Sequence, residues 1–126
     1  MNTLILSPYD AVSHRAWHQG LVTQLAGHDL TVLTMADRHF SWRFRGNSLW
    51  YSTCPELHSH WDLVIATSMT DLATLKGLVP ELAGTPVVVY FHENQFAYPS
   101  RQAGEHLIER QMTSIYSALA ADRLVF

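Results

Sequence analysis

Residues 87–95 read Val87-Val88-Val89-Tyr90-Phe91-His92-Glu93-Asn94-Gln95, an apolar run that passes directly into polar residues. An apolar run without alternation is typical of a parallel strand that is covered on both faces. In an open parallel sheet, ligands bind beyond the carboxyl ends of the strands. The stretch therefore predicts a buried strand over residues 87–91 and a ligand-binding edge that begins at His92.

Strands and helices alternate along the rest of the chain. Short apolar runs predict strands over residues 3–6, 30–33, 63–66 and 123–126. Helices are predicted over residues 14–26, 71–78 and 103–121. Ser13 is the expected N-cap of the first helix, and Gly27 its expected end. This alternation implies parallel crossover units, so we expect one α/β domain of Rossmann-like type, with a doubly wound, mainly parallel sheet and helices on both faces.

The composition fits a single domain with a hydrophobic core. The chain has 126 residues, of which 48 % are apolar and 15 % are charged. Soluble domains carry roughly 25 % charged residues. The low charge of this chain indicates either a sheet that is well covered or a surface that another part or molecule is meant to cover. The formal net charge of −3 excludes a general basic field for nucleic acid, and any such contact must be local.

Cysteine content and hydropathy predict a cytoplasmic soluble protein with no membrane contact. Cys54 is the single cysteine, which suits a reducing compartment. The first residues lack the features of a secretory signal, and no apolar run approaches the roughly 20 residues of a membrane span. The chain stops within the predicted strand 123–126. We interpret this as truncation before a further C-terminal domain; a true terminus after a short last strand is the alternative.

The polar residues after the buried strand are the first candidate site. They either face a ligand or cap the sheet edge by hydrogen bonds to loops, and we favour the ligand. His92 can exchange a hydrogen bond with a sugar hydroxyl or a phosphate. Glu93 could act as a base or orient His92. Because successive side chains of an extended chain point to opposite sides, at most one of the two faces the ligand directly.

The loop after the first predicted strand, residues 7–13, reaches the same edge. It lacks the G-x-G-x-x-G pattern of a standard dinucleotide site. His14 follows it at the start of a helix, where backbone N–H groups favour anions. A solvent-exposed histidine in the first turn is an equally good interpretation of His14.

A second candidate site lies within residues 38–51, where aromatic residues and arginines gather. Trp42-Arg43-Phe44-Arg45 alternates aromatic rings with guanidinium groups. Such pairs can stack bases and hold phosphates. The spacing alone favours a different interpretation, a half-buried strand with its arginines on the solvent face.

Eight histidines raise the question of a metal site. The candidates are His58-Ser59-His60 and the pair His14 and His18. Neither has a carboxylate or cysteine partner that the sequence identifies, so we predict no metal. Cys54 has no recognisable nucleophile context.

Several of these segments resemble one protein family. Tyr90-Phe91-His92-Glu93-Asn94-Gln95, with Tyr98-Pro99, is similar to the N-terminal domain of the tRNA-queuosine α-mannosyltransferases, which are glycosyltransferase-like proteins. Weaker similarities to that family lie in Ser13-His14-Arg15, Trp42-Arg43, Arg45, Ser48-Leu49, Tyr51-Ser52 and residues 116–126. One departure is Ala11-Val12, where the family has glycines. Glycine permits close approach of a backbone to a ligand, which the side chains of Ala11 and Val12 restrict in this loop.

The resemblance implies a fold and an activity. The family is similar to retaining transferases of GT-B architecture, like those of glycosyltransferase family 4, in which two Rossmann-like domains face each other across a cleft. It implies transfer of mannose from GDP-mannose, a nucleotide sugar, to queuosine in the anticodon of a tRNA, with neither a cofactor nor an obligatory metal. The C-terminal domain would hold most of the donor, so this N-terminal half would be inactive alone.

The residues and the resemblance together yield a set of expected roles. His92 is expected to be the catalytic residue that positions the transferred sugar. The expected substrate-binding residues are Ser13, His14, Arg43, Arg45, Glu93, Asn94, Gln95 and Tyr98. Among these, Arg43 and Arg45 would approach the acceptor RNA. Two alternatives stay open: a stand-alone Rossmann-like module that binds a nucleotide or phosphometabolite, and a scaffold domain whose strand-end polar residues bond internally.

Overall fold

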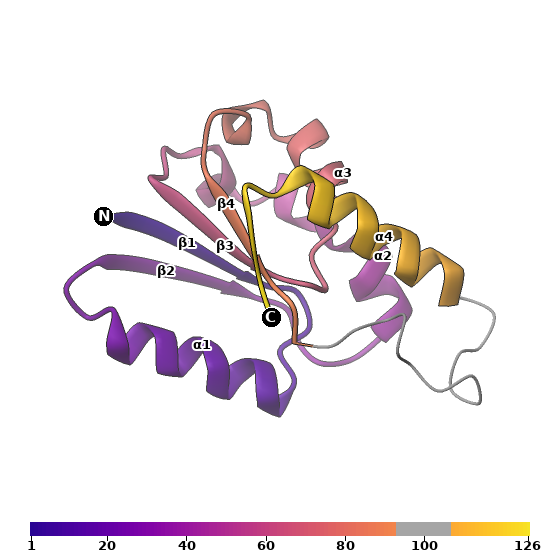
Figure 1. The fold of residues 1–126 in the computed structure, drawn as a ribbon, viewed down its shortest axis with the longest axis horizontal. Helices are drawn as coiled ribbons and strands as arrows, with labels where there is room; N and C mark the ends of the chain where they lie inside the picture. The colour runs from indigo at the N-terminus through magenta and orange to yellow at the C-terminus, as the bar shows by residue number, and fades with distance from the viewer. Residues whose placement is uncertain (93–106) are drawn as a thin grey trace.

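The fold is a parallel α/β sheet, as the alternating pattern predicts (Figure 1). The computed structural model describes residues 1–92 and 107–126. Its five strands are β1 (Asn2–Ser7), β2 (Asp29–Thr34), β3 (Leu63–Thr67), β4 (Val87–Tyr90) and β5 (Arg123–Val125). They lie in the order β2-β1-β3-β4-β5, and every neighbouring pair is parallel. The Rossmann-like α/β prediction is confirmed.

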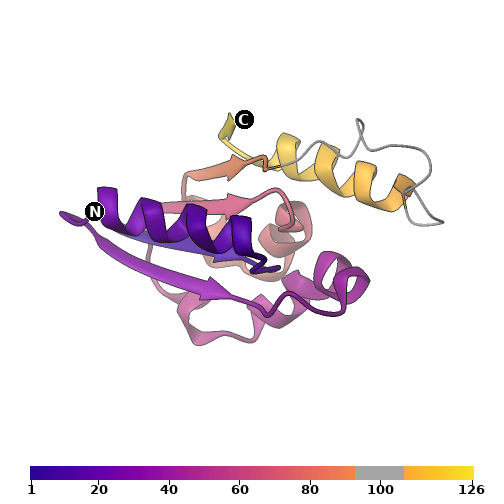
Figure 2. The ribbon, with the colours of Figure 1, turned by 90° about the horizontal axis from the view of Figure 1, so that it is seen from below.

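Helices cover both faces of this sheet. The α-helices are α1 (Val12–Gln24), α2 (Phe40–Ser52), α3 (Leu72–Leu78) and α4 (Leu107–Ala120), and two short 3-10 helices are η1 (Pro55–His58) and η2 (Pro80–Leu82). Helix α1 lies on one face, whereas α2, α3 and α4 lie side by side on the other (Figures 1 and 2). Right-handed crossovers produce this division. The chain moves from β1 to β2 in one direction along the sheet and from β2 past β1 to β3 in the other, so the connecting helices lie on opposite faces.

The main core lies between the sheet and α2 and α3. Alternate strand residues point to that face and are fully buried: Leu4, Leu6, Val64, Ala66, Val87 and Val89. They pack with Tyr51 of α2 and with Leu72 and Leu75 of α3. Each such aliphatic side chain stabilises the fold by roughly 1.5–3 kcal/mol. The apolar runs of the sequence thus hold the sheet to its helices.

The strand register brings the loops of the candidate site to one edge. Leu6 pairs with Ala66, and Thr67 pairs with Tyr90. The carboxyl ends of β1, β3 and β4 therefore lie next to one another. The loop after β1 leads to α1 on one face and the loop after β3 leads to α3 on the other, so the strand order reverses between them. This is the point at which open α/β sheets bind ligands.

Helix α1 differs from its prediction at both ends. It begins at Val12 with Ala11 as N-cap, and no side chain caps it. The predicted cap, Ser13, is instead an exposed residue of the first turn. The helix ends at Gln24 with Leu25 as C-cap, before Gly27. Arg15 and His18 of the helix bond to Asp10 in the loop before it, as described below.

Helix α2 replaces the half-buried strand that the alternating aromatic and arginine residues predicted. Its buried residues are Phe44, Gly46, Asn47, Ser48 and Tyr51, most of which recur at helical spacing. That spacing places one stripe of α2 against the core. The strand prediction was wrong because the stripe includes polar Asn47 and Ser48, which hide the apolar period.

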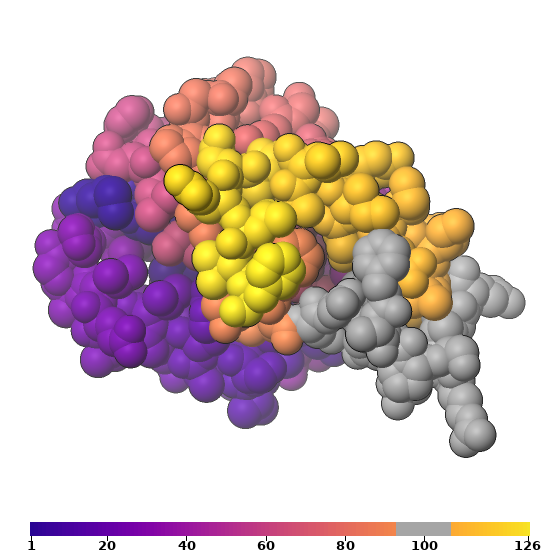
Figure 3. Space-filling view, viewed as in Figure 1, coloured from indigo at the N-terminus to yellow at the C-terminus, as the bar shows by residue number. Residues whose placement is uncertain are grey.

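Helix α4 and strand β5 also differ from expectation in their exposure. The apolar residues whose spacing predicted α4 point outward: Ile108 is 67 % exposed and Leu119 is 79 % exposed. The residues that α4 buries are Thr113, Ser114 and Ser117. All of β5 is exposed rather than buried, and both elements lie at the molecular surface (Figure 3). The predicted residues 103–106 of this helix lie outside the described part.

Among the described residues, no helix is both long and apolar enough to span a membrane.

Candidate functional site

His92 lies at the carboxyl edge of the sheet within a cluster of aromatic rings. The Phe91 backbone N–H still donates to the Val125 carbonyl (2.8 Å), which keeps the chain extended up to the histidine. The His92 ring stacks on His14 of α1, with centroids 4.1 Å apart and planes within 14°. Trp17 and Tyr90 contact it edge-on, at 4.9 and 4.8 Å. The ring orientation is therefore fixed from both α1 and β4.

The same packing keeps the His92 imidazole uncharged. Burial, and after it the neighbouring His14, lowers the pKa of His92 to about 4. At neutral pH the ring is a neutral donor and acceptor of hydrogen bonds. Its Nε2 atom is buried and has no hydrogen-bond partner among the described residues. His92 thus has an unused hydrogen-bonding atom at the ligand-binding edge. His14 is only 6 % exposed, so its interpretation as a solvent-exposed histidine was wrong.

Asp10 fixes the position of α1 relative to the sheet. Its backbone N–H donates to Met35 after β2 (2.9 Å). Its carboxylate accepts from Arg15 Nε (3.1 Å) and pairs with His18 Nε2 (2.9 Å). The sequence did not identify a carboxylate partner for His14 or His18, but Asp10 is such a partner for His18. The available signal was an acidic residue in the loop directly before the helix that carries both histidines.

The first turn of α1 faces the same edge and has favourable electrostatics for an anion. No side chain caps the helix, and its first turn contains no acidic residue. Uncapped N–H groups at a helix N-terminus attract negative charge. Ser13 and His14 lie in this turn, so the geometry is compatible with a phosphate or carboxylate there.

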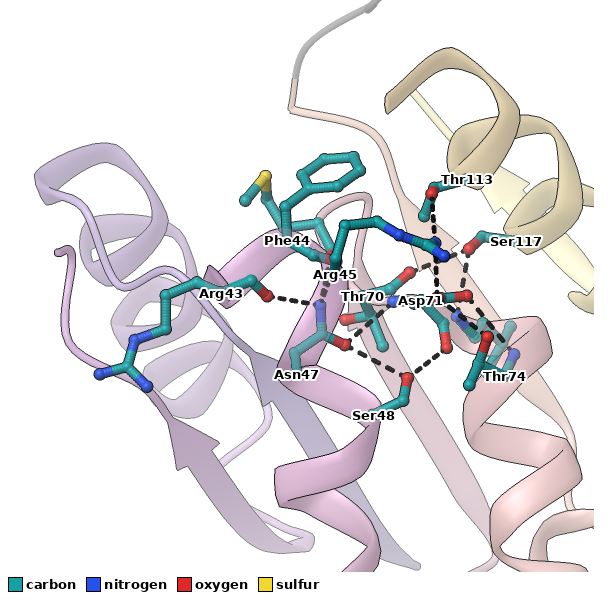
Figure 4. Close-up of polar contacts among 12 residues, drawn as sticks. Arg43, Phe44, Arg45, Asn47, Ser48, Thr70, Asp71, Thr74, Thr113 and Ser117 are labelled. Atoms are coloured by element: carbon teal, nitrogen blue, oxygen red, sulfur yellow. Dashed lines mark hydrogen bonds and ion pairs between the residues drawn. The ribbon is translucent and has the colours of Figure 1, made fainter. Parts of the chain in front are cut away.

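The two arginines of the second candidate site point in different directions from α2. In a helix, residues two apart lie about 200° apart around the axis. Arg45 Nη1 donates to Asp71 Oδ2 and to Thr113 Oγ1, each at 3.1 Å. Arg43 points away from that network (Figure 4), and its buried Nε has no partner among the described residues. Only Arg45 is therefore held by the fold.

Asn47 joins α2 to the loop after β3. Its side-chain Nδ2 donates to the carbonyls of Arg43 (2.7 Å), Phe44 (2.9 Å) and Met69 (2.9 Å). Its Oδ1 accepts from the backbone N–H of Asp71 (3.1 Å), as Figure 4 shows. The side chain is fully buried. The amide thus fixes the loop between β3 and α3 at the candidate edge.

Asp71 and Ser117 extend this network to α3 and α4. Asp71 caps α3, because its Oδ1 accepts from the backbone N–H of Thr74 (3.4 Å). Its Oδ2 also accepts from Thr74 Oγ1 (2.9 Å). Ser117 Oγ donates to the Thr70 carbonyl (2.9 Å) and accepts from the Leu72 N–H (3.1 Å). None of these residues was predicted to lie at this edge, although Asp71 directly precedes α3, as an N-cap does.

A hollow of about 80 Å³ lies between the starts of α2 and α4. It is lined by Phe40, Ser41, Phe44, Arg45, Glu109 and Arg110. The Arg110 guanidinium lies 5.6 Å from the centroid of the Phe40 ring. Phe40 also packs edge-to-face on Tyr9 (5.2 Å), in the loop after β1. This contact connects the start of α2 with the loop that leads to His14.

The predicted site residues fall into three groups. The structure brings His92 and His14 together and places Ser13 beside them on α1. It places Arg43 and Arg45 on opposite sides of α2. Glu93, Asn94, Gln95 and Tyr98 lie outside the described residues. The roles of all these residues stay predictions. Within residues 1–92 and 107–126, no three His, Cys, Asp or Glu side chains form a group that could hold a metal.

Comparisons with known proteins cover nearly the whole chain. The chain is 32 % identical over 123 residues to the tRNA-queuosine alpha-mannosyltransferase of Drosophila melanogaster. The match covers 98 % of this chain but 33 % of that protein, so the chain spans a third of the length of its relative. No solved structure matches. The family described as tRNA-queuosine alpha-mannosyltransferase N-terminal matches residues 2–126. The chain therefore belongs to the family of tRNA-queuosine alpha-mannosyltransferase N-terminal domains.

Proposed function

We propose that this chain is the N-terminal, acceptor-side domain of a cytoplasmic retaining glycosyltransferase of GT-B architecture. The whole enzyme transfers mannose from GDP-mannose to queuosine in tRNA. The observation that carries the proposal is the family match over residues 2–126. The threefold greater length of the relative supports a second domain that binds the donor.

In this proposal His92 positions the transferred mannose. Its Nε2 is the unused hydrogen-bonding atom at the carboxyl edge, and its ring is held by His14, Trp17 and Tyr90. A pKa of about 4 keeps the imidazolium form, the acidic form of the ring, unpopulated at neutral pH. His92 therefore acts by a hydrogen bond to a sugar hydroxyl rather than as a general acid. A preorganised hydrogen bond is effective because it needs no reorientation during the reaction.

The reaction exchanges one bond at the anomeric carbon of mannose. The bond to the β-phosphate oxygen of GDP breaks, a bond to a hydroxyl oxygen of queuosine forms, and the hydroxyl proton is released. Negative charge grows on the departing diphosphate. The uncapped first turn of α1 supports this step, because its N–H groups favour an anion.

The role of His92 is tested by substitution in the whole enzyme. We expect His92→Ala to lower the rate of mannosyl transfer to tRNA by about a hundredfold or more, which is typical of losing a preorganised hydrogen-bond donor. His28→Ala is the matched control, because His28 is exposed and lies before β2, at the opposite edge. Its transfer rate should equal that of the wild type. Wild-type transfer by a normally folded His92→Ala enzyme contradicts the assignment.

The donor is tested separately by calorimetric titration of the whole enzyme. GDP-mannose should bind more tightly than UDP-glucose or GDP-glucose. Equal affinity for all three refutes the choice of donor but leaves the acceptor-side role of the domain intact.

A further inference from the structure

Trp42 is a large aromatic side chain that α2 leaves 54 % exposed. Around the axis of α2, Trp42 lies about 160–200° from the buried residues Phe44 and Tyr51, which is the opposite side of the helix. Among the described residues, no other aromatic ring stacks on it. Exposed tryptophans of this kind are enriched at binding surfaces, because the ring offers a large contact area with few rotatable bonds.

Gly46 supports the indole of Trp42 from one side. A Cβ atom at Gly46 would lie 2.9 Å from three ring atoms of Trp42. Because the three distances are equal, the ring presents its face to the backbone at Gly46. One face of the indole therefore lies on α2, and the ring has a fixed orientation at the surface. This is the geometry of a stacking platform.

Arg43, the next residue, is a half-buried cation whose guanidinium has no ion pair among the described residues. Arg45 differs, because Asp71 and Thr113 hold its guanidinium. A planar guanidinium without a protein carboxylate is well suited to a phosphate oxygen pair.

Arginines gather near this pair, among the acidic residues Asp37, Asp71 and Glu109. Arg38, Arg43, Arg45 and Arg110 are half of the eight lysines and arginines in the sequence. Arg45 and Arg110 line one hollow with Phe40 and Glu109, and Arg38 lies two residues before the start of α2. Arginine side chains and aromatic rings thus lie together at the start of α2, which is the combination that binds single-stranded nucleic acid.

We propose that Trp42 and Arg43 bind one unpaired nucleotide of the acceptor RNA. Trp42 stacks on its base, and Arg43 binds a backbone phosphate. The inference rests on the proposed function, which supplies the RNA. The Tyr9–Phe40 contact places the start of α2 beside the loop that leads to His14 and His92. The nucleotide therefore binds along the same edge as the transferred sugar, as a neighbour of the modified base.

The stacking role is tested by RNA affinity. The probe is a fluorescein-labelled RNA hairpin with the sequence of a tRNA anticodon arm, titrated with the whole enzyme. Trp42→Ala should raise Kd about tenfold, as expected for the loss of one base–aromatic stack. Trp50→Ala is the matched control, because Trp50 lies near the other end of α2 and is 39 % exposed. It should change Kd less than about twofold.

The phosphate role is tested by salt dependence. Arg43→Gln should lower the slope of log Kd against log salt concentration by about one, because one phosphate contact is lost. Arg123→Gln makes the same change of charge at the first residue of β5, at the opposite edge of the sheet. It should leave the slope unchanged.

Two results separate this inference from the function on which it rests. If both variants bind the hairpin like the wild type while the enzyme still mannosylates tRNA, the inference is wrong and the function stands. If the wild-type enzyme neither binds the hairpin nor mannosylates tRNA, both are wrong. Circular dichroism of each variant shows that the fold is retained, so that a loss of affinity is due to the side chain.

Discussion

Asn47→Ala tests the idea that one buried amide fixes the loop after β3. The Asn47 side chain bonds three carbonyls and one backbone N–H across α2 and this loop. Alanine keeps the helix but removes these four hydrogen bonds, together with the bond from Ser48 Oγ to Asn47 Oδ1 (3.4 Å). The perturbation therefore addresses the loop at the ligand-binding edge and not the helical conformation of α2.

The size of the effect follows from the groups left without partners. The carbonyls of Arg43 and Phe44 keep their backbone bonds within α2. The Met69 carbonyl and the Asp71 N–H lose their partner in residues that are 1 % and 3 % exposed. Each unsatisfied buried group costs about 1–3 kcal/mol, so we expect a loss of about 4 kcal/mol in the free energy of unfolding. For a domain of this length, that lowers Tm by about 15 °C.

Urea unfolding followed by far-UV circular dichroism measures this loss. Asn2→Ala is the matched control, because the Asn2 amide donates to His60 in an exposed setting. It should cost less than about 1 kcal/mol. If the free energy of unfolding of Asn47→Ala lies within about 1 kcal/mol of the wild-type value, the Asn47 amide does not fix the loop.

Two further predictions concern the surroundings of the site. The His92 ring should titrate near pH 4 in imidazole ¹⁵N NMR, because burial lowers its pKa, and titration near pH 6.5 would contradict the buried stack. In the unfolded chain the same ring binds its proton near pH 6.5. The free energy of unfolding should therefore decrease as the pH is lowered from 6.5 to 4. Gly20→Ala should raise the free energy of unfolding by about 0.5–1 kcal/mol, because open space surrounds this glycine of α1. Gly46→Ala should gain less, since the Trp42 ring must move, and equal gains in urea unfolding would refute that contact.

The sheet was predictable because its strands are apolar runs with clear ends. Val87 and Val89 are fully buried on one face of β4, Val88 and Tyr90 are half-buried on the other, and the sequence accordingly lacks polar alternation. The position of His92 at the carboxyl edge followed from the parallel topology. Its stack on His14 did not follow, because this depends on how α1 lies across the sheet, which Asp10 fixes through tertiary contacts.

The packing of α2 and α4 could not be predicted from the sequence, because both helices bury polar residues. Asn47 and Ser48 interrupt the apolar period of α2, so the alternation of Trp42–Arg45 suggested a strand. The spacing of apolar residues predicted α4 correctly, but these residues lie on the solvent-exposed side of the helix and not on its buried side. A local sequence pattern predicts which side of a helix is buried only where the buried side chains are apolar. In α4, hydrogen bonds to neighbouring elements take the place of apolar contacts; in α2 they add to the apolar contacts of Phe44 and Tyr51.

Helix α4 consequently attaches to the domain in an unusual thermodynamic way. Its inward residues Thr113 and Ser117 bond to Arg45, Thr70 and Leu72, while Ile108 and Leu119 stay in solvent. Detaching such a helix exposes little apolar surface, so the detachment carries a small heat-capacity change and a weak dependence on urea. In native-state hydrogen exchange, α4 should therefore open as a separate cooperative unit before α2 and α3, by a partial opening that global unfolding measurements do not register.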